Sequence, residues 1–283
     1  MLAAVPVTLI VNPFATRVSE ERVRAFEARL DTIETLLTER RGHAIELARQ
    51  AKGDAVFVYG GDGLVNEALN GLPEGKPLGI IAGGHTNVLA RALGVPPDPA
   101  NAVHMRRISV GRVNGRRYAF SAGIGVDSET VRELETLKRA DDGKRRGDMA
   151  YARVVTRRLA RGYEPRLEIE GHGRAAMIFV SNDAVFTYAG PRAFRFSPDA
   201  RFELGLDFVA PERAGVASSV RWGARLFAGR GLAGLPGVLY AHDVDRIRVV
   251  CDRPLPLEAD GEDLGDVGEA IFEAERDAVS ILV

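Results

Sequence analysis

Short apolar runs alternate with helix-like patterns from the N-terminus to about residue 95. The apolar runs are residues 5–11, 55–59 and 78–81, and the helix-like stretches are a segment from Ser19 onward, residues 64–72 and residues 86–93. Alternation of short buried strands with helices is typical of a parallel sheet covered by helices. The first part of the chain is therefore predicted to be an α/β domain.

The segment that begins at Ser19 has the features of a helix N-terminus. Ser19 suits the N-cap position, and Glu20 and Glu21 follow it in the first turn, where the helix dipole favours acidic side chains. Apolar residues then recur at helical spacing, namely Val23, Phe26, Leu30, Ile33 and Leu37. This spacing predicts one helix that extends to Leu37 and covers one face of the sheet.

After the proline-rich stretch at residues 95–99 the pattern changes to many short strand candidates. These candidates are residues 108–113, 117–121, 166–169, 175–180, 202–209, 244–250 and 271–274. Helix-like inserts interrupt them at residues 128–139, 148–161 and 217–228. The pattern favours an all-β sandwich with helical inserts. We expect two domains, residues 1–105 and 106–283, with the last strand, about 277–283, packing back on the first domain.

The composition is that of a folded protein. The chain has 283 residues, of which 46% are hydrophobic and 27% charged, and its formal net charge is -1. These values argue against wholesale disorder and against a basic nucleic-acid-binding protein. The single cysteine, Cys251, excludes an internal disulfide, and no apolar run approaches the ~18–20 residues that span a bilayer. With no signal-peptide pattern at the start, a cytoplasmic protein is expected.

A glycine-rich loop follows the apolar run at residues 55–59. It comprises Gly60, Gly61, Asp62 and Gly63 and leads into a helix-like stretch that contains Asn66 and Glu67. A loop at this point of an α/β sheet exposes backbone N–H groups and a helix N-terminus to a phosphate. An ordinary strand-to-helix turn is the alternative interpretation, since glycine-rich turns are common.

A second loop repeats this arrangement one strand later. Gly83 and Gly84 are followed by His85, Thr86 and Asn87 and then by another helix-like stretch. Asn12-Pro13, at the end of the first strand, adds a third element at the same carboxyl edge of the sheet, where such folds bind ligands. The spacing matches neither a Walker A loop nor a dinucleotide-binding fingerprint.

Two carboxylates lie close together near the C-terminus. Asp260-Gly261-Glu262 follows an alternating segment that reads as an edge strand. Paired carboxylates at a strand end can accept a hydroxyl proton or hold a cation, but Asp-Gly is also a common hairpin turn signal. From the residues alone both interpretations stay open.

Taken in order, these motifs resemble the bacterial diacylglycerol kinase and lipid kinase family, which includes sphingosine and ceramide kinases. The matching segments are Asn12-Pro13, residues 60–67, residues 83–91, Gly123-Ile124-Gly125-Val126-Asp127, the helix start at residues 147–151 and Asp260-Gly261-Glu262. The resemblance implies an α/β domain related to NAD kinase, a β-sandwich domain, and transfer of the ATP γ-phosphoryl group to a lipid hydroxyl. Diacylglycerol is the expected acceptor, and phosphatidic acid the product. An NAD kinase-like or sphingosine-type kinase, or a catalytically weak nucleotide- or lipid-binding protein, are the alternatives.

The resemblance also implies roles for individual residues. The ATP-binding set would be Asn12, Thr38, Gly60, Gly61, Gly63, Asn66, Glu67, Gly83, Gly84, His85, Thr86 and Asn87. Asp62 and Asp127 would organise magnesium. Glu262 would accept the hydroxyl proton with Asp260 beside it, although sphingosine kinases point to the position of Asp62 as the base.

The sequence departs from the family pattern at several positions. Phe14-Ala15 stands where a small residue and glycine usually follow Asn-Pro, so that loop is expected to contribute less to phosphate binding. Ala82 replaces a proline and His85 a threonine; His85 can still donate to a phosphate. Leu204 occupies an expected acidic position of the family's structural magnesium site, and this metal is not predicted.

A basic stretch from Lys138 to Arg161 suggests contact with anionic lipid. Its local charge is +6, and Arg153, Arg157 and Arg161 form one stripe at helical spacing. A solvated helix face is the alternative. Trp222, Leu226 and Phe227 are a second set that faces either lipid or the core. A lipid substrate, no nucleic acid, peripheral contact with the inner membrane face and a homodimer complete the expected partners.

Overall fold

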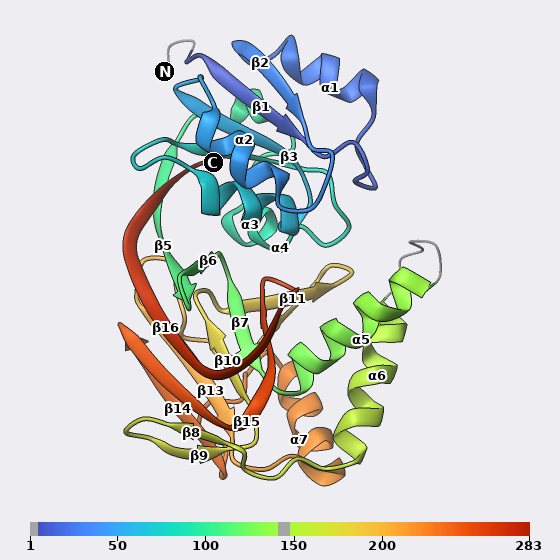
Figure 1. The fold of residues 1–283 in the computed structure, drawn as a ribbon, viewed down its shortest axis with the longest axis vertical. Helices are drawn as coiled ribbons and strands as arrows, with labels where there is room; N and C mark the ends of the chain where they lie inside the picture. The colour runs from blue at the N-terminus through green and yellow to red at the C-terminus, as the bar shows by residue number, and fades with distance from the viewer. Residues whose placement is uncertain (1–4, 141–147) are drawn as a thin grey trace. The chain divides into compact units, whose positions relative to one another are not determined.

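The structure is a computed structural model that describes residues 5–140 and 148–283. The chain divides into two compact units (Figure 1). Unit 1 contains the residues up to Val110 together with Arg276–Val283, and unit 2 is Gly111–Glu275. The end of the chain therefore belongs to the same unit as its beginning.

Unit 1 is built on a parallel sheet (Figure 1). Its strands are β1 (Val7–Val11), β2 (Thr32–Leu37), β3 (Ala55–Gly60), β4 (Leu78–Ala82) and the last residues of β16 (Glu262–Leu282), in the order β2, β1, β3, β4, β16. Each pair of neighbours in this order is parallel. β1 and β3 are buried along their whole length, as expected of strands covered on both faces. The predicted α/β architecture is confirmed.

Helices connect these strands. They are α1 (Glu20–Glu27), α2 (His43–Gln50), α3 (Asp62–Gly71), α4 (Val88–Leu93) and the short 3-10 helix η1 (Pro99–Asn101). Phe26 of α1 meets Tyr59 of β3 edge-to-face, with ring centroids 5.1 Å apart. α2 and α3 pack against each other and against β1 and β3.

The helix predicted from Ser19 to Leu37 is shorter than the sequence pattern indicates. Ser19 does cap it, accepting a hydrogen bond from the N–H of Arg22 at 3.4 Å, but the helix ends at Glu27. Residues 32–37 form β2 instead and pair with β1. Ile33 and Leu37 lie in this strand with exposed side chains, so their helical spacing is a coincidence. The β-branched residues of the segment favour a strand.

Unit 2 is rich in antiparallel strands. They are the end of β5 (Met105–Val113), β6 (Arg116–Tyr118), β7 (Ser121–Ile124), β8 (Leu167–Ile169), β9 (Gly173–Ala175), β10 (Ile178–Ser181), β11 (Val185–Ala189), β12 (Arg192–Arg195), β13 (Leu206–Pro211), β14 (Val238–Val244), β15 (Arg246–Ala259) and the start of β16. From β14 through β13, β10, β7 and β15 to β16 they follow one hydrogen-bonded path. The strand-rich character predicted for the C-terminal part is confirmed.

One strand, β15, joins what the sequence pattern treats as two separate sheets. Residues 249–251 of β15 pair with β8, and residues 257–259 pair with β7. The register of β15 against β16 shifts between Val250 and Leu255, around Pro254, which has no N–H to donate. A single irregular strand thus serves both groups of strands, which share one hydrogen-bonded network.

Three helices lie beside these strands (Figure 1): α5 (Val126–Ala140), α6 (Asp148–Ala160) and α7 (Val216–Phe227). Their bounds match the predicted inserts to within two residues. The predicted helix start at Gly147 and the basic residues Lys144, Arg145 and Arg146 lie outside the described residues. Within the described ranges, no helix has both the length and the apolar character that crossing a membrane requires.

Candidate active site

The predicted site residues fall in both units, and each group is considered within its own unit. In unit 1, Asn12, Thr38, Gly61 and Gly83 each come directly after a strand. Strand pairing places these positions at one edge of the sheet, since Val11 is opposite both Leu37 and Tyr59, and Gly60 is opposite Ala82. The edge is the carboxyl edge, where a ligand was expected.

The two glycine loops of unit 1 are in direct backbone contact. The N–H of Gly83 donates to the carbonyl oxygen of Gly60 at 2.7 Å. A Cβ added to Gly84 would lie 2.5 Å from the Cα of Gly61, and one added to Gly83 would lie 3.0 Å from the Cα of Gly60. Gly83 and Gly84 are therefore required by the contact between the loops, in addition to any requirement from a phosphate.

Asp62 connects the same two loops through its side chain. It is the first residue of α3 and is half-buried. Its Oδ1 accepts a hydrogen bond from the N–H of Leu89, in the first turn of α4, at 3.3 Å. Gly63 follows it in the first turn of α3, again half-buried. The Asp62 carboxylate thus lies at the start of two helices, where helix dipoles stabilise negative charge.

The second loop contains one buried and two more accessible polar side chains. Asn87 is buried in a left-handed conformation, and its amide group both accepts from the N–H of Gly84 and donates to the carbonyl of Gly84, each at 2.9 Å. His85 is exposed and Thr86 is half-buried. Asn87 therefore shapes the loop, and His85 and Thr86 are the side chains that a ligand can reach.

Glu67 has a structural role that the sequence did not reveal. Its carboxylate is buried and accepts hydrogen bonds from the N–H of Gly42 at 2.8 Å and from that of Ala44 at 3.1 Å. Gly42 is the N-cap of α2 and Ala44 lies in its first turn, so Glu67 satisfies donors that a helix N-terminus leaves unpaired. Its neighbour Asn66 is also buried. The buried Glu67 carboxylate therefore fixes the start of α2. Thr38, which precedes this helix in the chain, is also buried.

The loop after β1 folds back on itself and toward the second glycine loop. The side-chain oxygen of Asn12 accepts from the N–H of Phe14 at 3.0 Å, which leaves the Phe14 ring 82% exposed. The N–H of Arg17 donates to the carbonyl of Gly83 at 2.9 Å. The Phe14 departure from the family pattern thus puts an aromatic ring in solvent at the edge that was predicted to bind phosphate.

In unit 2, Asp260 is held by the backbone. Its carboxylate accepts hydrogen bonds from the N–H groups of Ala119, Phe120 and Ser121, at 2.6, 3.0 and 3.2 Å. Asp260 itself is buried and has a φ of 49° at the turn between β15 and β16. This carboxylate anchors the turn to the segment that enters β7. The hairpin interpretation of Asp-Gly therefore describes the local structure correctly.

Glu262 lies at the first position of β16, directly after this turn. Its Oε2 is 2.7 Å from a guanidinium nitrogen of Arg116, and both side chains are largely buried. The ion pair holds the Glu262 side chain in one place beside the anchored turn. Asp260 and Glu262, equivalent in the sequence pattern, are thus in different environments.

Two further buried acids lie together in unit 2. Glu258 is 1% exposed, and its Oε2 accepts a hydrogen bond from the N–H of Gly261 at 3.0 Å. Asp127, the predicted magnesium ligand, is 5% exposed and accepts a hydrogen bond from the hydroxyl of Tyr151. Burial, and next the charge of Asp127, raise the pKa of Glu258 well above its usual range. Burial raises the pKa of Asp127 as well, despite the hydrogen bond from Tyr151.

Sequence analysis did not single out Glu258. The alternation of apolar residues from 255 to 259 suggests that Glu258 faces solvent, but Leu257, Glu258 and Ala259 are all buried because both faces of this part of β15 are covered. The sequence therefore carries no signal for the burial of Glu258.

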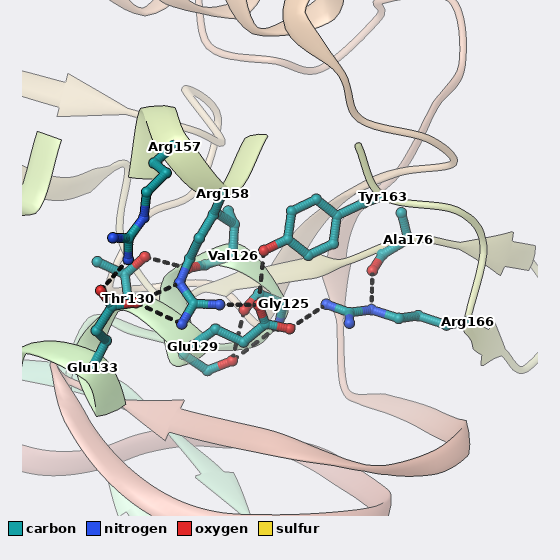
Figure 2. Close-up of polar contacts among 11 residues, drawn as sticks. Gly125, Val126, Glu129, Thr130, Glu133, Arg157, Arg158, Tyr163, Arg166 and Ala176 are labelled. Atoms are coloured by element: carbon teal, nitrogen blue, oxygen red, sulfur yellow. Dashed lines mark hydrogen bonds and ion pairs between the residues drawn. The ribbon is translucent and has the colours of Figure 1, made fainter. Parts of the chain in front are cut away.

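The arginines of α6 are only partly available for a partner (Figure 2). Glu129 of α5 accepts from Arg158, Arg166 and Tyr163, each at 2.7 Å. Glu133 accepts from Arg157 and from Arg158, and these bonds outweigh the effect of burial, so that the pKa of Glu133 is lowered. Arg153, Arg157 and Arg161 are all exposed, but Arg157 differs from the other two because it is paired with Glu133.

The segment of the family's structural metal site contains a satisfied carboxylate. Asp207 is fully buried and accepts hydrogen bonds from the hydroxyl of Tyr240 at 3.0 Å and the N–H of Asp243 at 3.1 Å. The Nδ1 of His242 lies 2.8 Å from Oδ1 and 3.0 Å from Oδ2 of Asp207. Groups of the protein thus bond both oxygens of Asp207.

Known proteins similar to this chain support the resemblance that its motifs indicate. The model of the diacylglycerol kinase catalytic domain matches residues 6–113. A diacylglycerol kinase of Bacillus subtilis is 27% identical over 236 residues, which are 78% of this chain and 75% of that protein. These matches confirm the resemblance to the bacterial diacylglycerol kinase family that the sequence motifs indicate, and they support a lipid kinase.

Other relatives match a shorter part of the chain. A diacylglycerol kinase of Staphylococcus saprophyticus is 37% identical over 117 residues, 35% of this chain and 38% of that protein. Among solved structures, a diacylglycerol kinase of Bacillus anthracis has a TM-score of 0.71 at 22% identity and covers 98% of this chain and 96% of its own. An NAD kinase of Archaeoglobus fulgidus in complex with ATP has a TM-score of 0.52 at 14% identity, covering 98% and 93%. These structures show that this chain shares the fold of both proteins.

Proposed function

We propose that this lipid kinase transfers the γ-phosphoryl group of ATP to the hydroxyl of diacylglycerol and forms phosphatidic acid. The observation that carries the proposal is the similarity to the Bacillus subtilis diacylglycerol kinase over three quarters of that protein. The match to the catalytic-domain model over residues 6–113 adds support, since it covers the glycine loops of unit 1.

We assign ATP binding to the carboxyl edge of unit 1. The start of α3 offers backbone N–H groups beside Gly60, Gly61 and Gly63, and a helix N-terminus attracts phosphate. His85 and Thr86 can donate to phosphate oxygens from the second loop, because both are accessible. Gly83, Gly84 and Asn87 would contribute by keeping the two loops together, and Glu67, Asn66 and Thr38 by supporting the elements behind them. An ATP-bound NAD kinase of the same fold is a further reason for this assignment.

Magnesium is assigned to Asp62. Magnesium in kinases is usually held by one or two carboxylates together with substrate phosphates, and a half-buried carboxylate at the phosphate-binding edge fits that requirement. Asp127 fits less well, because its carboxyl is buried beside Glu258 and bonded by Tyr151, so no step is assigned to it. A magnesium ion bound at Asp62 would neutralise charge on the transferred phosphoryl group.

Glu262 is proposed as the proton acceptor. Its carboxylate would take the proton of the lipid hydroxyl as that oxygen forms its bond to the γ-phosphorus and the bond from phosphorus to ADP breaks. The ion pair with Arg116 would keep Glu262 in a fixed orientation. Asp260 would act only by anchoring the turn, since its carboxylate already accepts three backbone N–H groups.

The fold supports one alternative function, phosphorylation of NAD. An NAD kinase has the same fold at a TM-score of 0.52, so a phosphoryl acceptor other than a lipid must be tested. Sphingosine is a second acceptor to include, and the exposed Phe14 and His85 are the reason to consider a protein with weak catalysis.

The test is a comparison of acceptors. The protein is incubated with magnesium, ATP labelled in its γ-phosphate, and diacylglycerol, sphingosine, ceramide or NAD in separate reactions. We expect label in phosphatidic acid and none, or far less, in the other products. Label in NADP alone would establish the alternative function, and ATP binding without label in any product would establish a binding protein.

A further inference from the structure

The exposed face of α7 carries apolar side chains that nothing in the described part of unit 2 covers. Val216, Val220 and Phe227 are 62%, 70% and 58% exposed. They recur at helical spacing, with Ala224 exposed between them, and so form one stripe. The opposite face is different, because Trp222 is buried in the core of unit 2. Of the set predicted to face either lipid or core, Trp222 thus faces the core and Phe227 does not.

The surroundings of this stripe are positively charged. From residue 213 to residue 242 the chain has four arginines and neither Asp nor Glu, and one of the four, Arg213, is paired with Glu164 at 2.7 Å. Arg221 and Arg225 of α7 donate to backbone carbonyls, and Arg192 of β12 donates to the carbonyl of Phe227 and lies over its ring at 5.1 Å. A carbonyl partner leaves the charge of an arginine in place. This differs from α6, where Glu133 neutralises Arg157.

The two helices meet near one end of the stripe. Tyr163, just after α6, forms a bridge with Ala214, just before α7. The exposed Arg161 therefore lies close to the segment that leads into Val216. The exposed Arg161, just after α6, and the apolar face of α7 belong to one region of unit 2, in which Figure 1 shows both helices.

We propose that the face of α7 formed by Val216, Val220 and Phe227, with its flanking arginines, docks on a bilayer that contains anionic phospholipid. A helix that lies in a membrane interface typically has apolar side chains flanked by cations. The apolar side chains enter the boundary of the acyl chains, and the cations contact the lipid phosphate groups. Charge complementarity selects an anionic surface. The inference rests on the proposed function, because a diacylglycerol acceptor resides in a membrane.

The experiment measures sedimentation of the full chain with vesicles of phosphatidylcholine, with and without phosphatidylglycerol. We expect the protein to bind the anionic vesicles at least ~10-fold more tightly than the neutral ones at low salt, and less tightly as salt rises. Val216→Glu with Val220→Glu should weaken anionic-vesicle binding at least ~10-fold. Val103→Glu, at an exposed valine of unit 1, is the matched control and should leave binding unchanged. Equal binding by the double variant and the wild-type protein would overturn the proposal.

Two further measurements keep the outcome clear. Val216→Ser with Val220→Ser repeats the test without new charge and should also weaken binding, and a thermal melt of each variant checks its fold. Activity on a short-chain diacylglycerol dispersed in detergent should be unchanged in both variants. If the protein is active in detergent but its vesicle binding does not depend on α7, the proposed docking surface is wrong and the proposed function stands. If the wild-type protein phosphorylates no lipid in detergent, the proposed function fails.

A second copy of the chain is the other occupant to test. Light scattering of the eluting protein should give the same mass for the wild-type protein and the double variant. A wild-type dimer that the substitutions convert to a monomer would show that α7 is a protein interface, and would overturn the membrane proposal.

Discussion

At the turn between β15 and β16, two carboxylates of the same motif have different surroundings. Asp260 accepts three backbone N–H groups, and Glu262 pairs with Arg116. A buried donor that loses its acceptor costs about 1–3 kcal/mol, whereas a proton acceptor contributes to the rate of transfer. Substitutions at these residues should therefore separate stability from catalysis.

Asp260→Asn should lower the stability of the protein. Asn tolerates the left-handed backbone of this position, so the substitution tests the carboxylate itself. One amide oxygen cannot replace two carboxylate oxygens, and we expect a loss of about 1–3 kcal/mol of unfolding free energy, measured in urea. An unchanged unfolding midpoint would show that the three hydrogen bonds contribute nothing.

Glu262→Gln should have the opposite profile. Removal of a positioned general base lowers kcat by about 10²–10⁴-fold, with KM for ATP little changed. Its unfolding midpoint should shift less than that of Asp260→Asn, because a single ion pair is lost. A raised KM for ATP with normal kcat would remove Glu262 from the proton-transfer step.

The buried Glu258 predicts a pH dependence of stability. Because the pKa of Glu258 is raised in the folded state, its contribution to stability is fully present below the pKa of the unfolded chain and is lost as pH rises through the folded-state value. Glu258→Gln should therefore melt at a higher temperature than the wild-type protein at pH 9, and at a similar temperature at pH 4. Parallel melting curves across pH would contradict the raised pKa.

At the scale of elements, the contact between the two glycine loops holds α3 and α4 in place at the edge of the sheet. Gly84→Ala should disrupt it, because the new Cβ would lie 2.5 Å from the Cα of Gly61 and one backbone must move. We expect a loss of about 1–3 kcal/mol of stability and a raised KM for ATP. Gly268→Ala, where no atom lies within 4 Å of the new Cβ, is the matched control. Equal melting temperatures for the two variants would show that the loops are not tightly packed.

At the scale of the whole molecule, local patterns were sufficient for much of the fold. The alternation of strands and helices predicted the parallel sheet, and motif order predicted the similarity to diacylglycerol kinases. The roles of Glu67 and Asp260 were missed because their partners are backbone N–H groups 23–25 and 139–141 residues away. Residues 32–37 were missed because Ile33 and Leu37, four residues apart, share a face in either a helix or a strand.

The central claim is that this chain phosphorylates diacylglycerol with the help of Asp62, and one measurement tests it most directly. Phosphatidic acid formed from diacylglycerol, magnesium and γ-labelled ATP is quantified for the wild-type protein and for Asp62→Asn. An amide of the same shape cannot supply the negative charge that holds magnesium, so the account predicts product from the wild-type protein and less than a tenth of its turnover from the variant, with both proteins folded. Equal turnover by the two, or no phosphatidic acid from the wild-type protein, would contradict the account.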